Sequence, residues 1–264
     1  MVIRKATLEE WFLIYQLDAL KHRHFHLPFY LTVDVTQLYQ QFQKKCQKMP
    51  TTALMVKAAG LVAKQHPAVN RLVFRTFYGW RILEPDYVSV NLPIMLRADT
   101  GNFLTATIFK DVNRLTLEQI QNHLKASLTQ DPKDSQIGKY LYQRRNHFLN
   151  RIRLKFIHFL VYHFPRFYET MQGGGIAVSS VMNCNRADVD LSMMAYGPTA
   201  FTLSSCNLTK EHDRYFLKIG IAYDHFACNG ETAIEAANTL SELLSGENPA
   251  LFDQLLSSSK PRPD

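Results

Sequence analysis

The N-terminal part of the chain alternates between two kinds of hydrophobic pattern. Residues 7–21 place apolar side chains at helical spacing, and they open with a capping-box pattern at 7–10. Residues 28–35 alternate apolar and polar positions, as a half-buried strand does. A helix is then expected from 36 to 48, and the next one, over 51–66, is apolar on most sides, so we expect it at the centre of the fold.

Short runs rich in β-branched and aromatic residues follow, separated by turn residues. The predicted strands cover 72–77, 81–83, 87–96 and 103–109. A second capping-box pattern at 116–119 opens a helix that is expected to reach about Leu128.

The second half of the chain begins with a predicted loop at 131–135 and one long basic helix from 137 to about 163. After Pro165 the pattern becomes β-rich, and the predicted strands cover 175–181, 199–206 and 215–223, with a polar hairpin connection at 207–213. A final helix is expected from about 231 to 244, stopped by Gly246. Strands and helices intermix without a Pro-, Gly- or Ser-rich linker, which predicts one domain of α/β or α+β type over 1–256 and a flexible tail at 257–264.

Composition allows a large core, because 46% of the residues are hydrophobic and the chain holds 17 Phe and 12 Tyr. The net charge of +7 suits anionic partners such as acidic lipid or a phosphate, although many soluble proteins are equally basic. The four cysteines form no CxxC pair and no zinc-like cluster with histidine, so no metal is expected. No signal-type apolar core and no transmembrane run of about 20 residues is evident, which favours a cytoplasmic location.

The first candidate for chemistry is a histidine at the end of a strand. His225 follows the apolar run 215–223 and precedes a tight turn at Asn229 and Gly230. A histidine held rigidly in one tautomer can accept a proton from a thiol or a hydroxyl. From spacing alone, a structural histidine at a strand end remains the simpler interpretation.

The second candidate is the glycine-rich segment 171–180. Its three glycines allow close backbone approach, and two adjacent serines, Ser179 and Ser180, must face opposite sides of the predicted strand. One hydroxyl could therefore point into a cleft and stabilise an oxyanion. A glycine-rich turn followed by an ordinary strand explains the same residues, and the Gly-Lys-Ser/Thr ending of a phosphate loop is missing.

These two segments, in this order, resemble the catalytic domain of the dihydrolipoamide acyltransferases, the cores of the 2-oxoacid dehydrogenase complexes and relatives of chloramphenicol acetyltransferase. Residues 171–180 are similar to the family's Gly-Gly-x-Phe-Thr-Ile-Ser segment, and 224–230 to its Asp-His-Arg-x-x-Asp/Asn-Gly motif. Three more segments agree, and they are 26–38, 51–70 and 103–120. The resemblance covers roughly 26–245 and implies a chloramphenicol acetyltransferase-like fold: α/β, an α+β two-layer sandwich in which a mixed β-sheet is covered by helices.

The resemblance also implies direct acyl transfer through a tetrahedral intermediate, with no acyl-enzyme, no metal and no tightly bound cofactor. His225 would be the general base, Ser179 would stabilise the oxyanion, and Asn229 would support the loop. Acyl-CoA or an acyl carrier protein would be the co-substrate, and the site would form between the subunits of a homotrimer. The other positions expected to contact the substrate are Gly173, Gly174, Ser180, Asp224 and Gly230.

Several residues depart from the family's pattern. Phe226 replaces the arginine that follows the histidine, and residues 102–107 replace a stretch that borders the substrate channel. The acyltransferase-like part begins within the first ~35 residues, which is too short for a lipoyl domain. We therefore expect a stand-alone acyltransferase with a different substrate. The alternative is a catalytically inactive member used as a binding or assembly module.

A basic-aromatic insertion at 137–165 precedes the glycine segment, and stand-alone proteins that the chain resembles also carry such a stretch. Residues 139–155 hold six basic side chains and no acidic one, and an aromatic run follows. Such a helix, over 139–164, can contact an anionic membrane surface, which would suit lipid or polyketide tailoring. It could also dock an acidic carrier protein or a CoA phosphate, or lie with a solvated basic face and an apolar face on the core. No nucleic-acid-binding motif accompanies the charge, so no nucleic acid is expected as a partner.

Overall fold

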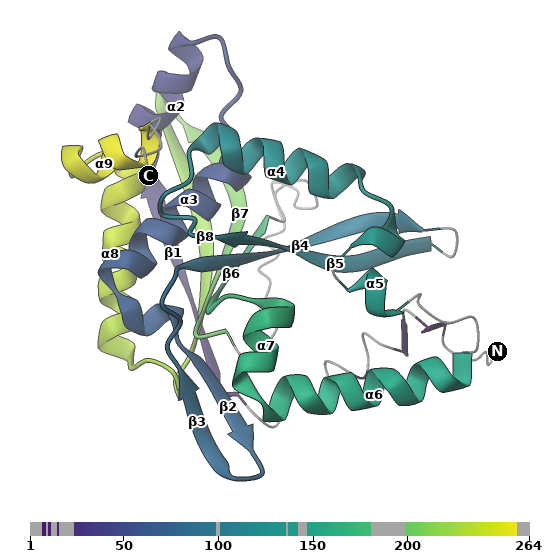
Figure 1. The fold of residues 1–264 in the computed structure, drawn as a ribbon. Coiled ribbons are helices and arrows are strands. Elements are labelled where there is room, and N and C mark those ends of the chain that lie inside the picture. The colour runs from purple at the N-terminus through teal and green to yellow at the C-terminus, as the bar shows by residue number, and fades with distance from the viewer. Residues whose placement is uncertain are drawn as a thin grey trace, which may run out of the picture.

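A six-stranded mixed sheet forms the centre of the computed structural model, with the strand order β1-β8-β7-β6-β4-β5, and β2 and β3 form a separate hairpin. The structure describes residues 7–8, 10–11, 15, 24–98, 101–135, 137–141, 147–180 and 199–257. In Figure 1, α8 and α9 lie along one side of the sheet, and the β2–β3 hairpin projects away from it near α7 and α6.

The strands are β1 (His26–Asp34), β2 (Leu72–Thr76), β3 (Gly79–Leu83), β4 (Ser89–Ala98), β5 (Gly101–Lys110), β6 (Ile176–Ser180), β7 (Phe201–Glu211) and β8 (Arg214–Asp224). The α-helices are α2 (Thr36–Lys44), α3 (Thr51–Gln65), α4 (Leu117–Thr129), α5 (Gly138–Leu141), α6 (His147–His163), α7 (Pro165–Gln172), α8 (Gly230–Ser245) and α9 (Pro249–Leu256). Two short 3-10 helices, η1 (Pro67–Asn70) and η2 (Pro132–Asp134), complete the described elements.

The pairing of the strands makes the sheet mixed, as predicted. β8 is antiparallel to both of its neighbours, β1 and β7, and β4 is antiparallel to β5, whereas β6 is parallel to both β7 and β4. The start of β1 therefore lies beside the end of β8, with His26 opposite Asp224. One corner of the sheet joins residues that are about 200 positions apart in the sequence.

The central helix α3 is buried along most of its length, which its uniformly apolar sequence predicts. Lys57 is the exception in composition, because it is a buried cation among alanine, valine and leucine. Its Nζ donates hydrogen bonds to the carbonyl oxygens of Asn113 and Leu115, at 2.9 and 2.6 Å. Burial lowers the pKa of Lys57, and the two carbonyls tie the turn before α4 to the core.

Several local signals were confirmed. Thr116 and Gln119 form a reciprocal capping box at the start of α4, and Thr7 and Glu10 exchange the same pair of hydrogen bonds. Gly246 ends α8 in the left-handed conformation, at φ +83°. Most of the predicted helix over 7–21 lies outside the described residues, as does the tail apart from Ser257.

The single long helix predicted from 137 to 163 is wrong. The side-chain amide of Asn150 donates to the carbonyl of Leu141, whereas nine residues of continuous helix would span about 13.5 Å. α5 and α6 are therefore separate helices that pack against each other.

Two further helices were not predicted, and one loop is shorter than expected. Pro165 begins α7, and Asn248 and Pro249 begin α9, where the side chain of Asn248 accepts a hydrogen bond from Leu251 N–H. The predicted connection at 207–213 is mostly strand, because β7 continues to Glu211. Only a two-residue turn remains before β8.

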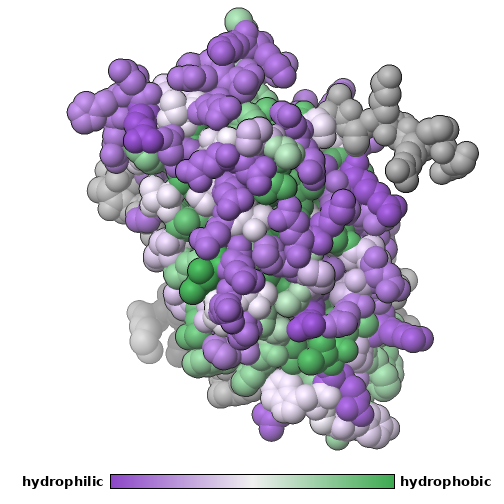
Figure 2. Space-filling model, turned by 90° about the vertical axis from the view of Figure 1, so that its left-hand side faces the viewer, coloured by the Kyte–Doolittle hydropathy of each residue, from purple (hydrophilic) through white to green (hydrophobic). Residues whose placement is uncertain are grey.

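The outer surface over α8 and α9 is largely hydrophilic, and hydrophobic side chains gather in the lower half of that view (Figure 2). Among the residues that the structure describes, no helix is long and apolar enough to cross a membrane.

Candidate functional site

His225 stands immediately after β8, at the corner that β8 shares with β1. Its backbone N–H donates to the carbonyl of Phe25 at 2.9 Å, while its side chain is exposed. The imidazole lies beside the rings of Phe25 and Tyr223, with centroids 6.5 and 6.0 Å away. The backbone is therefore anchored, and the ring remains open to an incoming molecule.

A buried carboxylate beneath His225 holds this corner together. Asp224 is fully buried, and its Oδ1 accepts the backbone N–H groups of Phe25 and Phe226 at 3.2 and 3.0 Å. Its Oδ2 accepts the Nδ1–H of His24 at 2.7 Å. Burial alone would raise the pKa of Asp224, but the hydrogen bonds from His24 and Phe226 outweigh it and leave that pKa below its usual range. Asp224 was predicted to contact the substrate, and this stays a prediction; its described hydrogen bonds join parts of the chain.

Two residues at this corner were missed by sequence reasoning. Burial lowers the pKa of His26, whose Nε2 has no hydrogen-bond partner among the described residues. His24 meets Asp224 only because β1 pairs with β8, and no local pattern encodes that pairing.

Cys228 also lies near Asp224, but burial, helped by the Asp224 charge, raises the pKa of this thiol to about 11. Cys228 is therefore protonated at neutral pH and unsuited to be a nucleophile.

Asn229 and Gly230 complete the turn after His225. Asn229 is the N-cap of α8, and its Oδ1 accepts the backbone N–H of Thr232 at 2.9 Å. A Cβ at Gly230 would lie 3.2 Å from the hydroxyl oxygen of Tyr223. The backbone N–H groups of Ala227 and Cys228 bond to the carbonyl of Asp224 at 2.9 and 3.1 Å, so the loop between β8 and α8 is compact.

The glycine segment before β6 is packed too tightly for any side chain. A Cβ at Gly175 would lie 2.1 Å from the carbonyl oxygen of Asn70, and one at Gly174 would lie 2.6 Å from that of Ser89. Gly173 and Gly174 also have positive φ values, +62° and +28°. The three glycines therefore seat the start of β6 directly against η1 and β4.

The two serines of β6 face opposite ways, as predicted. Ser179 is buried and Ser180 is exposed. The backbone carbonyl of Ser179 accepts a hydrogen bond from the hydroxyl of Ser205 at 3.4 Å, which ties the end of β6 to β7.

The structure does not bring Ser179 and His225 together within one chain. The strand register aligns Ser179 with Ser204 of β7, and Ser204 with Gly220 of β8. His225 is five residues farther along, so the two side chains are about 15–20 Å apart from strand geometry. A site that contains both side chains requires a second copy of the chain.

Phe226, which stands where the resembling family has arginine, is exposed beside His225. Its ring centroid lies 5.0 Å from that of Trp80 and 6.5 Å from that of Phe25. The immediate surroundings of His225 on this side are therefore aromatic rather than charged.

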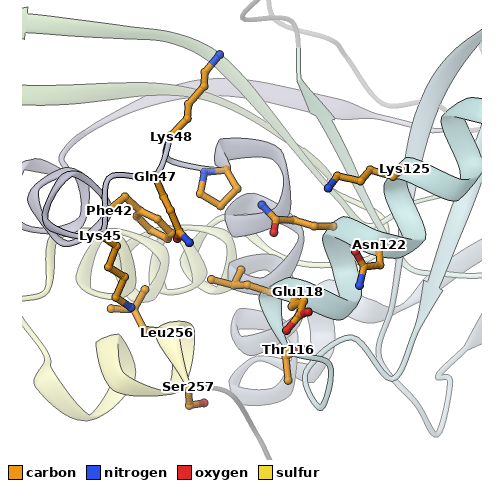
Figure 3. A pocket seen from close by; sticks show the side chains of 13 residues that line it. Phe42, Lys45, Gln47, Lys48, Thr116, Glu118, Asn122, Lys125, Leu256 and Ser257 are labelled. Carbon is orange, nitrogen blue, oxygen red and sulfur yellow. The ribbon is translucent and has the colours of Figure 1, made fainter.

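Figure 3 shows the residues that line an open groove of about 660 Å³. The end of α2, the loop after it, the first turns of α4 and the chain around Leu256 form its walls, and it holds three lysines and one glutamate. Neither His225 nor Ser179 lines it. Among the described residues, no group of three or more His, Cys, Asp or Glu side chains could hold a metal ion.

No protein-family model and no curated protein matches the chain. Solved structures do match it over nearly their full length. A truncated catalytic core of the 2-oxoacid dehydrogenase complex from Thermoplasma acidophilum is 13% identical with a TM-score of 0.67, over 94% of this chain and 100% of that one. A dihydrolipoamide acetyltransferase from Azotobacter vinelandii is 16% identical with a TM-score of 0.64, over 96% and 94%.

A chloramphenicol acetyltransferase is 12% identical with a TM-score of 0.52, over 91% of this chain and 99% of that one. At these identities the likeness establishes the fold. The chain has the chloramphenicol acetyltransferase-like fold of the dihydrolipoamide acyltransferase cores, which confirms the fold predicted from the sequence.

Proposed function

We propose that the chain is an acyltransferase that passes an acyl group from a CoA or carrier-protein thioester to a thiol, hydroxyl or amine. The proposal rests on the geometry at His225, where the backbone is held by a hydrogen bond to Phe25 and the imidazole is exposed. The Azotobacter vinelandii enzyme has been investigated for the roles of a serine, a histidine and an asparagine in its catalytic mechanism, and the last two are four positions apart. His225 and Asn229 have the same spacing on the same fold.

In the proposed reaction, the neutral imidazole of His225 removes the proton from the acceptor as the acceptor attacks the thioester carbon. The carbonyl oxygen becomes an oxyanion, which the Ser179 hydroxyl of a neighbouring chain stabilises by donating a hydrogen bond. The intermediate then collapses, the carbon–sulfur bond breaks, and the thiolate takes the proton from the imidazolium. The acyl group is never bonded to the protein.

The separation of Ser179 from His225 supports a shared site in a homotrimer. Each chain would supply His225 to one interface and Ser179 to the other, so three equivalent sites would form around a closed ring. Acyl-CoA or an acyl carrier protein would be a co-substrate.

The first experiment measures thiol release from a panel of acyl-CoAs and acyl carrier proteins with thiol, hydroxyl and amine acceptors. Donors can first be ranked by thermal shift, because a ligand that binds only the folded state stabilises it. His225→Ala should lower turnover by about 10²–10⁴-fold while the fold survives. Ser179→Ala should also lower it, whereas Ser180→Ala, one residue away on the opposite face, is the matched control.

Retained turnover in His225→Ala would contradict the role of this residue. The exposed Phe226 favours a second candidate, a catalytically inactive binding or assembly module. That candidate would be supported if wild-type protein released no thiol from any donor in the panel.

A mixing experiment tests the shared site directly. His225→Ala and Ser179→Ala chains should each have strongly lowered turnover alone, but when the two are co-expressed, about a quarter of the interfaces in randomly mixed trimers would pair two intact residues. Partial recovery of activity is therefore expected. No recovery in mixed trimers, verified by two affinity tags, would contradict an inter-subunit site.

A further inference from the structure

The helix α6 carries an apolar stripe on its exposed face. Five large hydrophobic side chains on this helix are exposed, and they follow helical spacing, so that they form one continuous stripe: Phe148, Leu149, Ile152, Phe156 and Phe159. A surface helix normally turns such a stripe toward the core.

The opposite face of α6 packs against the protein and includes polar side chains. Asn150 and His158 are buried there together with Leu154, Val161 and Tyr162. The packing of these buried side chains fixes the orientation of α6. The stripe is therefore exposed even though the helix packs against the rest of the protein. Exposed apolar stripes of this kind mark contact surfaces.

The tip of the β2–β3 hairpin extends the stripe. Phe77, Tyr78, Trp80 and Ile82 are exposed, and the ring of Phe77 lies 6.2 Å from those of Phe159 and Phe164. On its other side, Trp80 contacts Phe226 at 5.0 Å, next to His225. The α6 stripe and the hairpin tip together form one aromatic surface, which ends at the corner of the proposed site.

Charge distinguishes the possible occupants of this aromatic surface. Residues 72–83 and 147–168 contain no Asp or Glu, and their exposed basic side chains are Arg75, Arg81, Lys155 and Arg166. Aromatic side chains surrounded by Arg and Lys fit the boundary between lipid acyl chains and anionic headgroups. A two-fold contact with a second copy would instead place these cations against one another.

We propose that the aromatic surface docks on an anionic lipid bilayer, with Trp80 and the α6 stripe in the headgroup region. His225 then stands beside the membrane, so an acceptor or acyl donor dissolved in lipid can reach it. This docking does not depend on the proposed acyl transfer, and its tests use no substrate.

The first test is flotation of the full chain with vesicles of phosphatidylcholine alone and of phosphatidylcholine with phosphatidylglycerol. Binding is expected to the anionic vesicles only and to weaken as salt screens the charges. In a Trp11→Phe background, Trp80 is the sole tryptophan, and its emission should shift to the blue and be quenched by brominated lipid. An unshifted Trp80, or no binding by the wild-type chain, would overturn the proposal.

The second test is a double variant, Ile152→Ser with Phe156→Ser, which removes side chains that are 52% and 60% exposed. Its matched control is Leu128→Ser with Ile234→Ser, which removes side chains that are 50% and 58% exposed on α4 and α8. The stripe variant should lose at least about tenfold in vesicle partition, and the control should keep it.

Sedimentation of the same variants separates a membrane surface from a subunit interface. The oligomeric state should be unchanged by the stripe substitutions. If they dissociate the assembly, or if both double variants lose vesicle binding equally, the surface is not a specific bilayer contact.

Discussion

The two halves of the proposed site are held by different kinds of interaction. At the His225 corner, a buried carboxylate joins strands from the two ends of the chain through hydrogen bonds to His24, Phe25 and Phe226. At the Ser179 strand, Gly174 and Gly175 seat the backbone against other backbone atoms, with no room for a Cβ. The structure of the His225 corner therefore depends on the charge of a carboxylate, and that of the Ser179 strand depends on the small volume of glycine.

This difference predicts which changes each half can tolerate. A carboxylate clamp is sensitive to loss of charge and to pH, whereas close backbone packing is sensitive to a single added methyl group. Residues 173–180 contain no titratable side chain, so pH should act on the corner and leave the glycine packing unaffected.

The largest effect is expected from Asp224→Asn. The amide keeps an oxygen for the two backbone N–H groups but loses the charge that holds His24, so the free energy of unfolding should fall by about 2–4 kcal/mol. Displacement of the His225 backbone should lower turnover by roughly 10²-fold. Urea unfolding and the thiol-release assay measure the two effects.

Asp34→Asn is the matched control for Asp224→Asn. Asp34 lies at the other end of β1, accepts hydrogen bonds from Thr36 and pairs with Arg214 of β8. Its replacement should leave turnover unchanged. Equal losses of turnover in the two variants would show that the Asp224 clamp has no special link to His225.

Gly175→Ala should have the next largest effect, through volume alone. The new methyl group would lie 2.1 Å from the carbonyl oxygen of Asn70, and forcing the backbones apart should cost about 2–3 kcal/mol. Turnover should fall because the start of β6 positions Ser179. Gly79→Ala is the control, since its Cβ meets nothing within 4 Å and adds only the strain of φ +98°. A milder effect at Gly175 than at Gly79 would contradict the tight packing.

The sequence predicted features that are encoded locally, and it missed those that depend on distant parts of the chain. The Gly246 stop of α8 was predicted and confirmed, and the helix begins at Gly230, one residue before the predicted start, after the Asn229 cap. The separation of α5 from α6 was missed because both segments have helical composition, so the sequence between 137 and 163 keeps a helical period. The bond from His24 to Asp224 joins residues 200 positions apart, and only the pairing of β1 with β8 brings them together.

The proposed site shows the same division. His225 and Ser179 were proposed from the ordered motifs, because strand-end residues and glycine segments are visible in sequence. The family resemblance implied that the two come from different subunits, but the distance between them within one chain depends on the strand order of the folded sheet.

A smaller effect is expected on acidification, and it should arise at histidines. Burial lowers the pKa of His26 at the corner and of His123 on α4. As the pH falls below the ordinary histidine value of about 6.5, the unfolded chain binds protons that the folded chain does not, so stability decreases. Asp224 does not add to this loss of stability near pH 6, because its pKa is lowered in the folded chain. The stabilisation that its carboxylate provides is lost only when the pH falls below the usual carboxyl range.

The free energy of unfolding, measured with urea between pH 7.5 and 5, should therefore decline as the pH falls. The decline should be shallower in His26→Phe and in His123→Gln than in the wild type. Gly175→Ala should have the same pH slope as the wild type, because the packing it disturbs has no titratable group. A slope that is unchanged in both histidine variants would contradict this assignment.

The smallest effect should come from Asn229→Ala, which removes the cap of α8 and should cost about 1 kcal/mol. Asn248→Ala, at the cap of α9, is the matched control and should cost a similar amount in the free energy of unfolding. Only Asn229→Ala should also lower turnover, since Asn229 closes the turn that begins at His225. Asn229→Asp retains an oxygen acceptor for Thr232 N–H, so it should restore both properties. If Asn229→Ala unfolds more easily but turns over as fast as the control, the cap stabilises α8 without positioning His225.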